Sequence, residues 1–235
     1  MKTYRTNAVM AGALYILGTV AGILSVVNVG GFPDEDFFAR MAADPSRLTL
    51  SAFLILTMGF SLAAMTLFLY PLFRKDSGPL AMGMVLFRGA FEGTWYILSA
   101  LIWVTLGALI KEIASAGADS AALQAVGNLA VQADGYLGDI GTCAFIVGAA
   151  CLYTSFYRTR LIPRWLSGWG LVAAVPYLVN YLLHFFGIDP GLDFLVLPLA
   201  VQEMVMGLWL IIKGFSPDAV NELEGARPRT PQPAD

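Results

Sequence analysis

The chain has 235 residues, of which 57% are hydrophobic and 13% are charged, and its mean hydropathy is +0.69. Soluble domains carry about 25% charged and about 45–50% apolar residues, so this composition excludes an ordinary soluble domain. The net charge of −3 offers no basic surface for a nucleic acid, and no nucleic-acid partner is expected.

Six apolar runs follow one another along the chain, and each is long enough to cross a hydrocarbon core about 30 Å thick. A backbone inside lipid must satisfy its own hydrogen bonds, so the runs are predicted to be α-helices. An all-α, polytopic bundle of six transmembrane helices is expected over residues 1–215, with a disordered tail over residues 216–235. The runs are Ala8–Val29, Leu48–Leu72, Ser77–Ile110, Ile140–Tyr157, Trp165–Ile188 and Phe194–Ile212.

Two of the connections are long. The segment Gly30–Arg47 is acidic and then aromatic, which is compatible with a short helix lying at the membrane surface, although a simple connector is favoured. The segment Lys111–Gln132 is rich in alanine, and Asp119 or Ser120 is placed to cap a short helix there. A simple connector without a helix is favoured for this segment too.

The lysines and arginines outside the apolar runs predict the orientation, because cytoplasmic loops carry more of them than external loops. Ten fall on the side of the two termini and three on the other side, so both termini are expected in the cytoplasm. The ten are Lys2, Arg5, Arg74, Lys75, Arg158, Arg160, Arg164, Lys213, Arg227 and Arg229, and the three are Arg40, Arg47 and Lys111.

Three residues that are charged at neutral pH fall inside the apolar runs, where an unpaired charge is costly and usually functional. Arg88 and Glu92 are four residues apart on the third span, so they share a helix face and can pair. Glu203 lies near the middle of the last span. If the two helices face each other, one arginine meets two carboxylates, and one of these is free to exchange a proton.

A second polar layer is expected nearer the outside. Asn180 and His184 are one turn apart on the fifth span, and Asp134 and Asp139 lie at the start of the fourth. Such a layer above a charge cluster can line an outward-facing cavity or a proton route. The alternatives are that the buried charges only fix helix packing, that His184 is simply packed or wetted, and that the aspartates are loop residues.

Several kinds of site lack the residues they need. With one histidine in the chain, a haem held by two histidines and a zinc site of three histidines are both excluded. No nucleotide-binding or nucleophile motif is present. We therefore predict no catalytic residues, no metal and no cofactor, and the sequence favours a non-enzymatic role.

Three stretches resemble a bacterial family known as domain of unknown function 4386. They are LFRGAFEG at 86–93, LYTSFYRTRLIPRWLSGWGLVAAVPYLVN at 152–180 and QEMVMGLWLIIKGF at 202–215. Where this family often has a histidine before a Gly-Tyr pair, the chain has Gln132 before Gly135 and Tyr136. The resemblance implies a multi-pass protein of the bacterial plasma membrane and implies no activity.

We therefore expect a membrane protein that binds or transports a small molecule or ion through Arg88, Glu92 and Glu203. In this hypothesis Arg88 holds an anionic group or a carboxylate, and a glutamate exchanges a proton. His184, Asn180 and Asp139 are further binding or proton-exchange candidates. The alternatives are a structural or regulatory protein that acts through a protein partner, and an enzyme acting on a lipid or quinone. The lipid bilayer is the one partner that composition requires, and the oligomeric state stays open.

Overall fold

The computed structural model describes residues 2–30, 37–116, 121–189 and 191–225. These residues form helices joined by short turns, with no β-strand among them. The elements are α1 (Lys2–Val29), α2 (Phe37–Ala43), α3 (Ser46–Asp76), α4 (Gly78–Met84), the π-helix η1 (Val85–Phe91), α5 (Glu92–Ala116), α6 (Ala121–Thr159), α7 (Arg164–Phe185), the 3-10 helix η2 (Asp193–Val196), α8 (Leu197–Ile212) and α9 (Pro217–Gly225).

The predicted six-helix membrane bundle is confirmed. Six helical segments are long and apolar enough to cross a membrane: Tyr4–Val29, Ser46–Asp76, Gly78–Glu112, Ala125–Thr159, Arg164–Phe185 and Asp193–Ile212. The outward faces of these helices carry large apolar side chains that water would solvate poorly, such as Leu101 at 61% exposed and Val172 at 73% exposed. The chain is therefore a multi-pass membrane protein.

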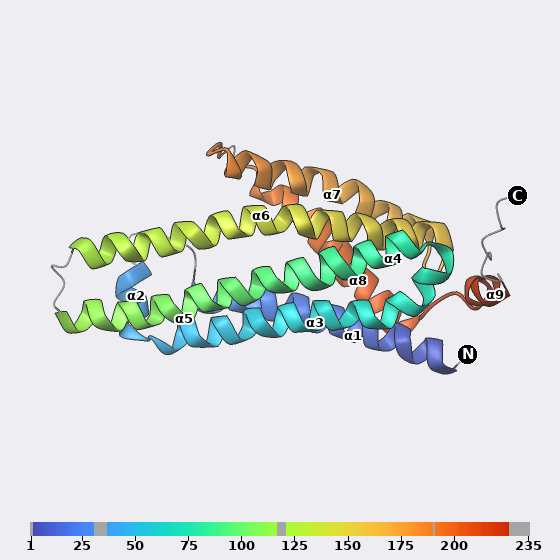
Figure 1. Ribbon diagram of the computed structural model, residues 1–235, viewed down its shortest axis with the longest axis horizontal. Helices are drawn as coiled ribbons and strands as arrows, with labels where there is room; N and C mark the ends of the chain where they lie inside the picture. The colour runs from blue at the N-terminus through green and yellow to red at the C-terminus, as the bar shows by residue number, and fades with distance from the viewer. Residues whose placement is uncertain (1, 31–36, 117–120, 190, 226–235) are drawn as a thin grey trace, which may run out of the picture.

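The six spans form a closed ring around a common interior. Each span packs against the next in the order α1, α3, α5, α6, α7 and α8, and α8 packs back against α1. Because the number of spans is even, α1 begins and α9 ends at the same end of the bundle (Figure 1). We call this the terminal end. A glycine permits the ring to close, since a Cβ on Gly12 of α1 would lie 2.6 Å from the carbonyl oxygen of Gly207 in α8.

The connection before the fourth span differs from the expected loop over Lys111–Gln132. The helix α5 continues to Ala116, and α6 begins at Ala121, so the fourth span begins at Ala125 rather than at Ile140. Alanine is the best helix former, and it extends both helices past the apolar runs. Figure 1 shows α5 and α6 running side by side beyond the end of α7. The expected caps, Asp119 and Ser120, lie outside the described residues.

The connection before the second span contains a short helix, which was the alternative to the favoured simple connector. This is α2, which buries Phe37 and Met41 and packs against α5 and α3. The acidic residues that precede it, at positions 34–36, lie outside the described residues.

The tail also differs from the sequence-based expectation of disorder from residue 216. Residues 217–225 form α9, which buries Ala219 and Val220 at the terminal end. The Tyr4 hydroxyl donates a hydrogen bond to Glu224 Oε1 at 2.7 Å. Leu223 also packs against the core, at helical spacing from Ala219 and Val220, but three apolar residues within nine form a short pattern that the sequence reasoning missed. Residues 226–235 lie outside the described residues.

Candidate functional site

The third span contains a stretch that is not α-helical. Residues Val85–Phe91 form a π-helical turn between α4 and α5, and Arg88 is buried within it. Such turns are rare and occur frequently at functional sites. A glycine of α6 lets the turn approach closely, because a Cβ on Gly148 would lie 2.6 Å from the backbone nitrogen of Arg88. The close contact with α6 fixes the position of the arginine.

The Arg88 guanidinium binds both glutamates that the sequence singled out. Its Nη1 donates to both carboxylate oxygens of Glu92, each at 3.1 Å. Its Nη2 donates to Glu203 Oε1 at 3.0 Å. The planar fork of arginine suits a contact with two carboxylates, since its donors point in fixed directions. The structure therefore brings Arg88, Glu92 and Glu203 into one cluster from the third and sixth spans.

Two tyrosines complete this cluster. Tyr15 of α1 accepts a hydrogen bond from Arg88 Nη2 at 2.8 Å and donates one to Glu203 Oε1 at 2.6 Å. Tyr96 donates to Glu92 Oε1 at 3.1 Å. The sequence reasoning missed both residues. The signal was a tyrosine in the middle of an apolar span, because its hydroxyl needs a partner there.

An aromatic ring covers one face of the guanidinium. The centre of the Phe145 ring, on α6, lies 4.4 Å from Arg88 Cζ. A cation over an aromatic face is attracted to the ring, more strongly where water is excluded. The hydrogen bonds of Arg88 Nη1 and Nη2 go to side chains of the protein itself, and the anionic groups among them are Glu92 and Glu203. Its Nε makes no hydrogen bond to the described residues.

The two glutamates differ in their access to open space. The Arg88 and Glu92 side chains are 1% exposed, whereas the Glu203 side chain is 13% exposed. Both glutamates border a cavity of about 200 Å³ between the spans, and Glu203 is the more exposed of the two. A single water needs only about 10–15 Å³ of such volume, so the cavity has room for several waters or a small solute. Its walls are Thr19, Gly22, Ile23, Met58, Leu62, Arg88, Glu92, Trp95, Tyr96, Phe145, Tyr177 and Glu203.

Aromatic rings lead from this cavity along α7 toward the end opposite the termini. Tyr177 lines the cavity, and its ring stacks on Tyr181 with their centres 5.0 Å apart. The Tyr181 ring lies 6.3 Å from that of His184. His184 is the last titratable residue of α7, so a row of polar aromatic side chains joins the cavity to the end of the helix opposite the termini.

Aspartates lie around His184 at the end opposite the termini. Its Nε2 lies 3.7 Å from Asp189 Oδ1 and 3.7 Å from Asp193 Oδ1. Asn180 donates to Asp193 Oδ1 at 3.4 Å. Asp139 of α6 is half-buried and lies close enough to His184 to interact with it electrostatically. The structure therefore gathers His184, Asn180 and Asp139 at one place, together with two aspartates that the sequence reasoning did not consider.

Asp134 lies apart from this group. Its carboxylate accepts a hydrogen bond from Ser99 Oγ at 2.5 Å and one from Trp103 Nε1 at 2.8 Å. Both donors belong to α5, so Asp134 ties α6 to α5. Among the residues that the structure describes, no three or more His, Cys, Asp or Glu side chains are grouped so that they could hold a metal ion.

No curated protein and no solved structure matches this chain. One family model matches it, over residues 10–214, and its description is "Domain of unknown function (DUF4386)". This range includes five spans in full, the first span from Met10 onward, and every residue of the charge cluster. The chain belongs to the DUF4386 family of membrane proteins.

Proposed function

We propose that this protein binds and transports a small cation, which it exchanges for a proton at Glu203. The observation that carries the proposal is the cavity beside Glu203, a carboxylate held by Arg88 and Tyr15 yet partly open to that space. A transport site needs a group that is fixed in position and can still be reached by the solute. Glu203 meets both requirements.

The charges of the cluster favour a cation over an anion. Two carboxylates, Glu92 and Glu203, share one guanidinium, so their full ionisation would leave one negative charge that a proton or a cation must neutralise in a medium of low dielectric constant. The Arg88 Nη donors are already used. Aromatic faces also line the cavity, and the Trp95 and Tyr96 rings stack on each other at 4.6 Å. Such faces attract organic cations.

The row of Tyr177, Tyr181 and His184 supports a route between the cavity and the outer surface. Histidine changes its charge near neutral pH, and proton relays in membrane proteins use such residues. In this proposal His184, with Asn180 and Asp139 beside it, passes protons between water and the cavity. The excess of Lys and Arg at the terminal end supports an orientation with both termini in the cytoplasm, and the family resemblance supports a location in the bacterial plasma membrane.

The proposal is tested by cation-driven proton movement in liposomes that enclose a pH-sensitive dye. The probes are Na⁺, K⁺, guanidinium, tetramethylammonium and choline, each added outside at equal ionic strength. We expect at least one of them to change the internal pH in liposomes with the wild-type protein and to have no such effect with Glu203→Gln. The exposed Glu112 lies at the end of the third span, so Glu112→Gln is the matched control and should behave as the wild type.

The proposal fails if all five cations give the same trace with the protein as with protein-free liposomes. It also fails if Glu203→Gln moves protons as the wild type does. Circular dichroism and size-exclusion chromatography of the variant check that it is folded, because Gln keeps the shape of Glu and can still accept hydrogen bonds from Arg88 and Tyr15.

One observation favours a second candidate, a structural or regulatory protein without a small substrate. The Arg88 and Glu92 side chains are 1% exposed, and Arg88 Nη1 donates to both carboxylate oxygens of Glu92. A buried ion pair of this kind can serve only to fix helix packing. In that case Arg88→Met combined with Glu92→Leu should fold, give no change in proton movement, and still capture the same protein partners.

A further inference from the structure

A second hollow lies at the terminal end, away from the charge cluster. It measures about 330 Å³ and is bounded by the turn between α6 and α7, at 160–163, and by the segment after α8, at 213–217. The backbone nitrogen of Ser216 donates to the carbonyl oxygen of Leu161 at 2.9 Å, which joins the two segments. The hollow is therefore built by two short connections that are held against each other.

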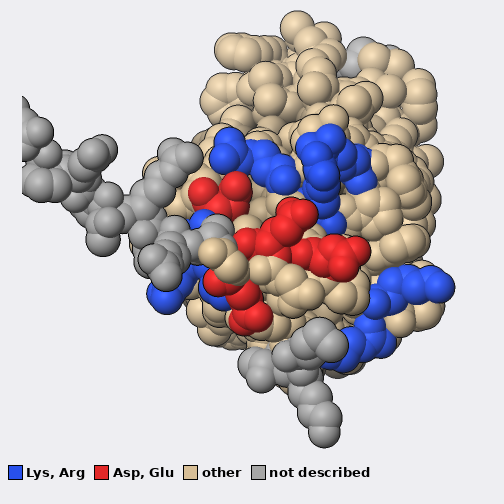
Figure 2. Space-filling view, turned by 90° about the vertical axis from the view of Figure 1, so that its right-hand side faces the viewer, with Lys and Arg blue, Asp and Glu red and all other residues tan. Residues whose placement is uncertain are grey.

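Two positive side chains line this hollow, Arg160 and Lys213. Neither head group has a hydrogen bond or an ion pair within the described part of the chain. Two other arginines at this end do have acceptors: Arg158 donates to Asp76 Oδ2 at 2.8 Å, and Arg5 donates to Ile211 O at 2.8 Å. Figure 2 shows Lys and Arg side chains around a band of acidic ones on this face. Among the residues that the structure describes, Arg160 and Lys213 are thus basic side chains of the hollow without an acceptor.

The backbone at Arg160 is unusual. Its φ is 54°, which lies in the left-handed region. Arg160 follows directly after Thr159, the last residue of α6. Glycine is the usual residue at such a position because a Cβ is strained there. An arginine kept in a strained conformation suggests that its side chain has a task at this place.

Apolar and aromatic groups adjoin the hollow on the side of the spans. Trp209 lines it, and the Trp165 ring lies edge-on to Trp209 with centres 6.4 Å apart. Ile212 is 65% exposed just beside Lys213. Tryptophans at this level are typical of the membrane surface, where lipid head groups meet the chains. A head group in the hollow would leave its acyl chains along the exposed sides of α7 and α8.

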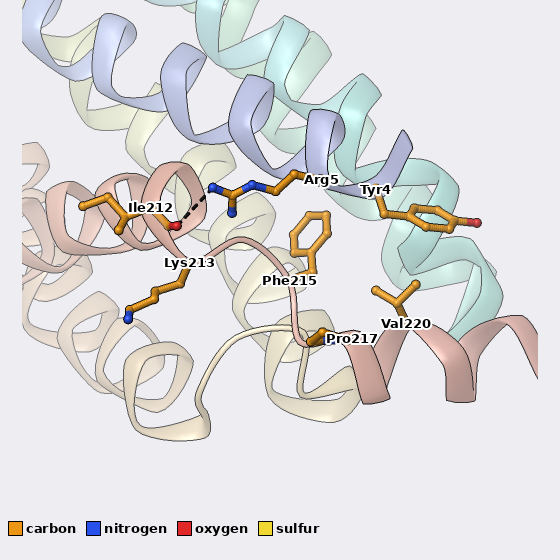
Figure 3. A pocket seen from close by; sticks show the side chains of 7 residues that line it. All are labelled: Tyr4, Arg5, Ile212, Lys213, Phe215, Pro217 and Val220. Carbon is orange, nitrogen blue, oxygen red and sulfur yellow. Dashed lines mark hydrogen bonds between the residues drawn. The ribbon is translucent and has the colours of Figure 1, made fainter. Parts of the chain in front are cut away.

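The neighbouring pocket has no tryptophan among its lining residues, and its arginine is already hydrogen-bonded. It measures about 350 Å³ and lies between α1, the end of α8 and α9, with Tyr4, Arg5, Lys213 and Val220 among its walls (Figure 3). Arg5 is bound there to the carbonyl oxygens that end α8, Ile211 and Ile212. Figure 3 shows Lys213 pointing away from Tyr4 and Val220. In that pocket Arg5 is therefore already hydrogen-bonded, and Lys213 also lines the hollow of Arg160.

We propose that the hollow of Arg160 and Lys213 binds the phosphate of an anionic phospholipid. The two cations supply charge-assisted hydrogen bonds to phosphate oxygens, and Trp209 packs against the glycerol and the first carbons of the chains. Basic pockets at the cytoplasmic ends of spans are suited to such head groups. This site is separate from the charge cluster and does not depend on the transport proposal.

The test uses delipidated full-length protein in a neutral detergent, with short-chain phosphatidylglycerol as the probe. Native mass spectrometry gives the dissociation constant, and the melting temperature gives an independent reading. Arg160→Gly removes the guanidinium and also the strain at φ 54°. This variant should therefore melt near the wild-type temperature and yet bind the lipid about tenfold or more weakly, as expected for loss of a charged contact. Lys213→Gln should weaken binding similarly.

Three further measurements decide between the proposal and its rivals. Arg74→Gln, at an exposed arginine of α3 outside the hollow, should bind phosphatidylglycerol as the wild type does. Short-chain phosphatidylcholine and inorganic phosphate should bind more than tenfold more weakly. Equal binding of phosphatidylcholine, full binding of inorganic phosphate alone, or unchanged lipid binding in Arg160→Gly would each overturn the assignment.

Discussion

Replacement of Arg88 by methionine probes the charge cluster most severely. Methionine is flexible and can fill most of the space of the arginine stem, so the change chiefly removes the positive charge. Glu92, at 1% exposed, then keeps only the hydroxyl of Tyr96 as a donor among the described residues. Glu203 keeps Tyr15.

The size of the effect follows from these contacts. Arg88 donates four hydrogen bonds, three of them to carboxylate oxygens. Removal of one partner of a buried ion pair costs about 3–5 kcal/mol, because the other charge is left in a medium of low dielectric constant. We therefore expect Arg88→Met to lower the free energy of unfolding by about 3–5 kcal/mol.

The assay is reversible unfolding in mixed micelles with increasing denaturing detergent, followed by tryptophan fluorescence. Arg74→Met makes the same change at an exposed site and should alter the free energy of unfolding by less than about 0.5 kcal/mol. The double variant Arg88→Met with Glu92→Leu removes both charges of the sealed pair and should be more stable than Arg88→Met alone. If Arg88→Met unfolds together with the Arg74→Met control, the cluster does not hold the spans as described.

Three further changes test neighbouring contacts. Gly148→Ala places a Cβ 2.6 Å from the backbone nitrogen of Arg88 and should lower the free energy of unfolding in detergent by about 1–3 kcal/mol. Gly135→Ala, on the same helix, adds a Cβ where there is open space and should be neutral or stabilising. Equal stability of the two variants would contradict the close approach of α6 to Arg88. Tyr15→Phe removes a donor to Glu203 and should alter the pH dependence of proton movement in liposomes while keeping the fold, so an unchanged pH profile would count against its role. Asp134→Leu leaves the Ser99 hydroxyl and the Trp103 indole without this acceptor and should cost about 1–3 kcal/mol, with a wild-type melting temperature as the contrary result.

The six spans were predictable because the membrane demands long apolar helices, and the chain has six such runs. Their ends were less predictable. The segment before Ile140 looked like a loop because polar residues such as Gln132 and Asp134 interrupt it, yet α6 runs through it from Ala121. Asp134 is accommodated there by Ser99 and Trp103 of α5. A pattern within one segment cannot reveal such donors on another helix.

The charge cluster was partly predictable as geometry. The spacing of four residues put Arg88 and Glu92 on one helix face, and the position of Glu203 within its span put it at a similar depth. The π-helical turn around Arg88 and the contacts from Tyr15 and Phe145 could not be foreseen. They depend on how α1 and α6 close the ring. The functional role of these residues stays a proposal.

The exchange of a proton for a cation at Glu203 is the central step of the proposed transport. Infrared difference spectroscopy of carboxyl groups measures this exchange when a cation that drives proton movement is added to the protein in lipid. We expect the wild type to lose a protonated carboxyl band and gain a carboxylate band, and Glu203→Gln to lack both changes. A wild-type spectrum without a carboxyl change, or the same change in Glu203→Gln, would contradict the account.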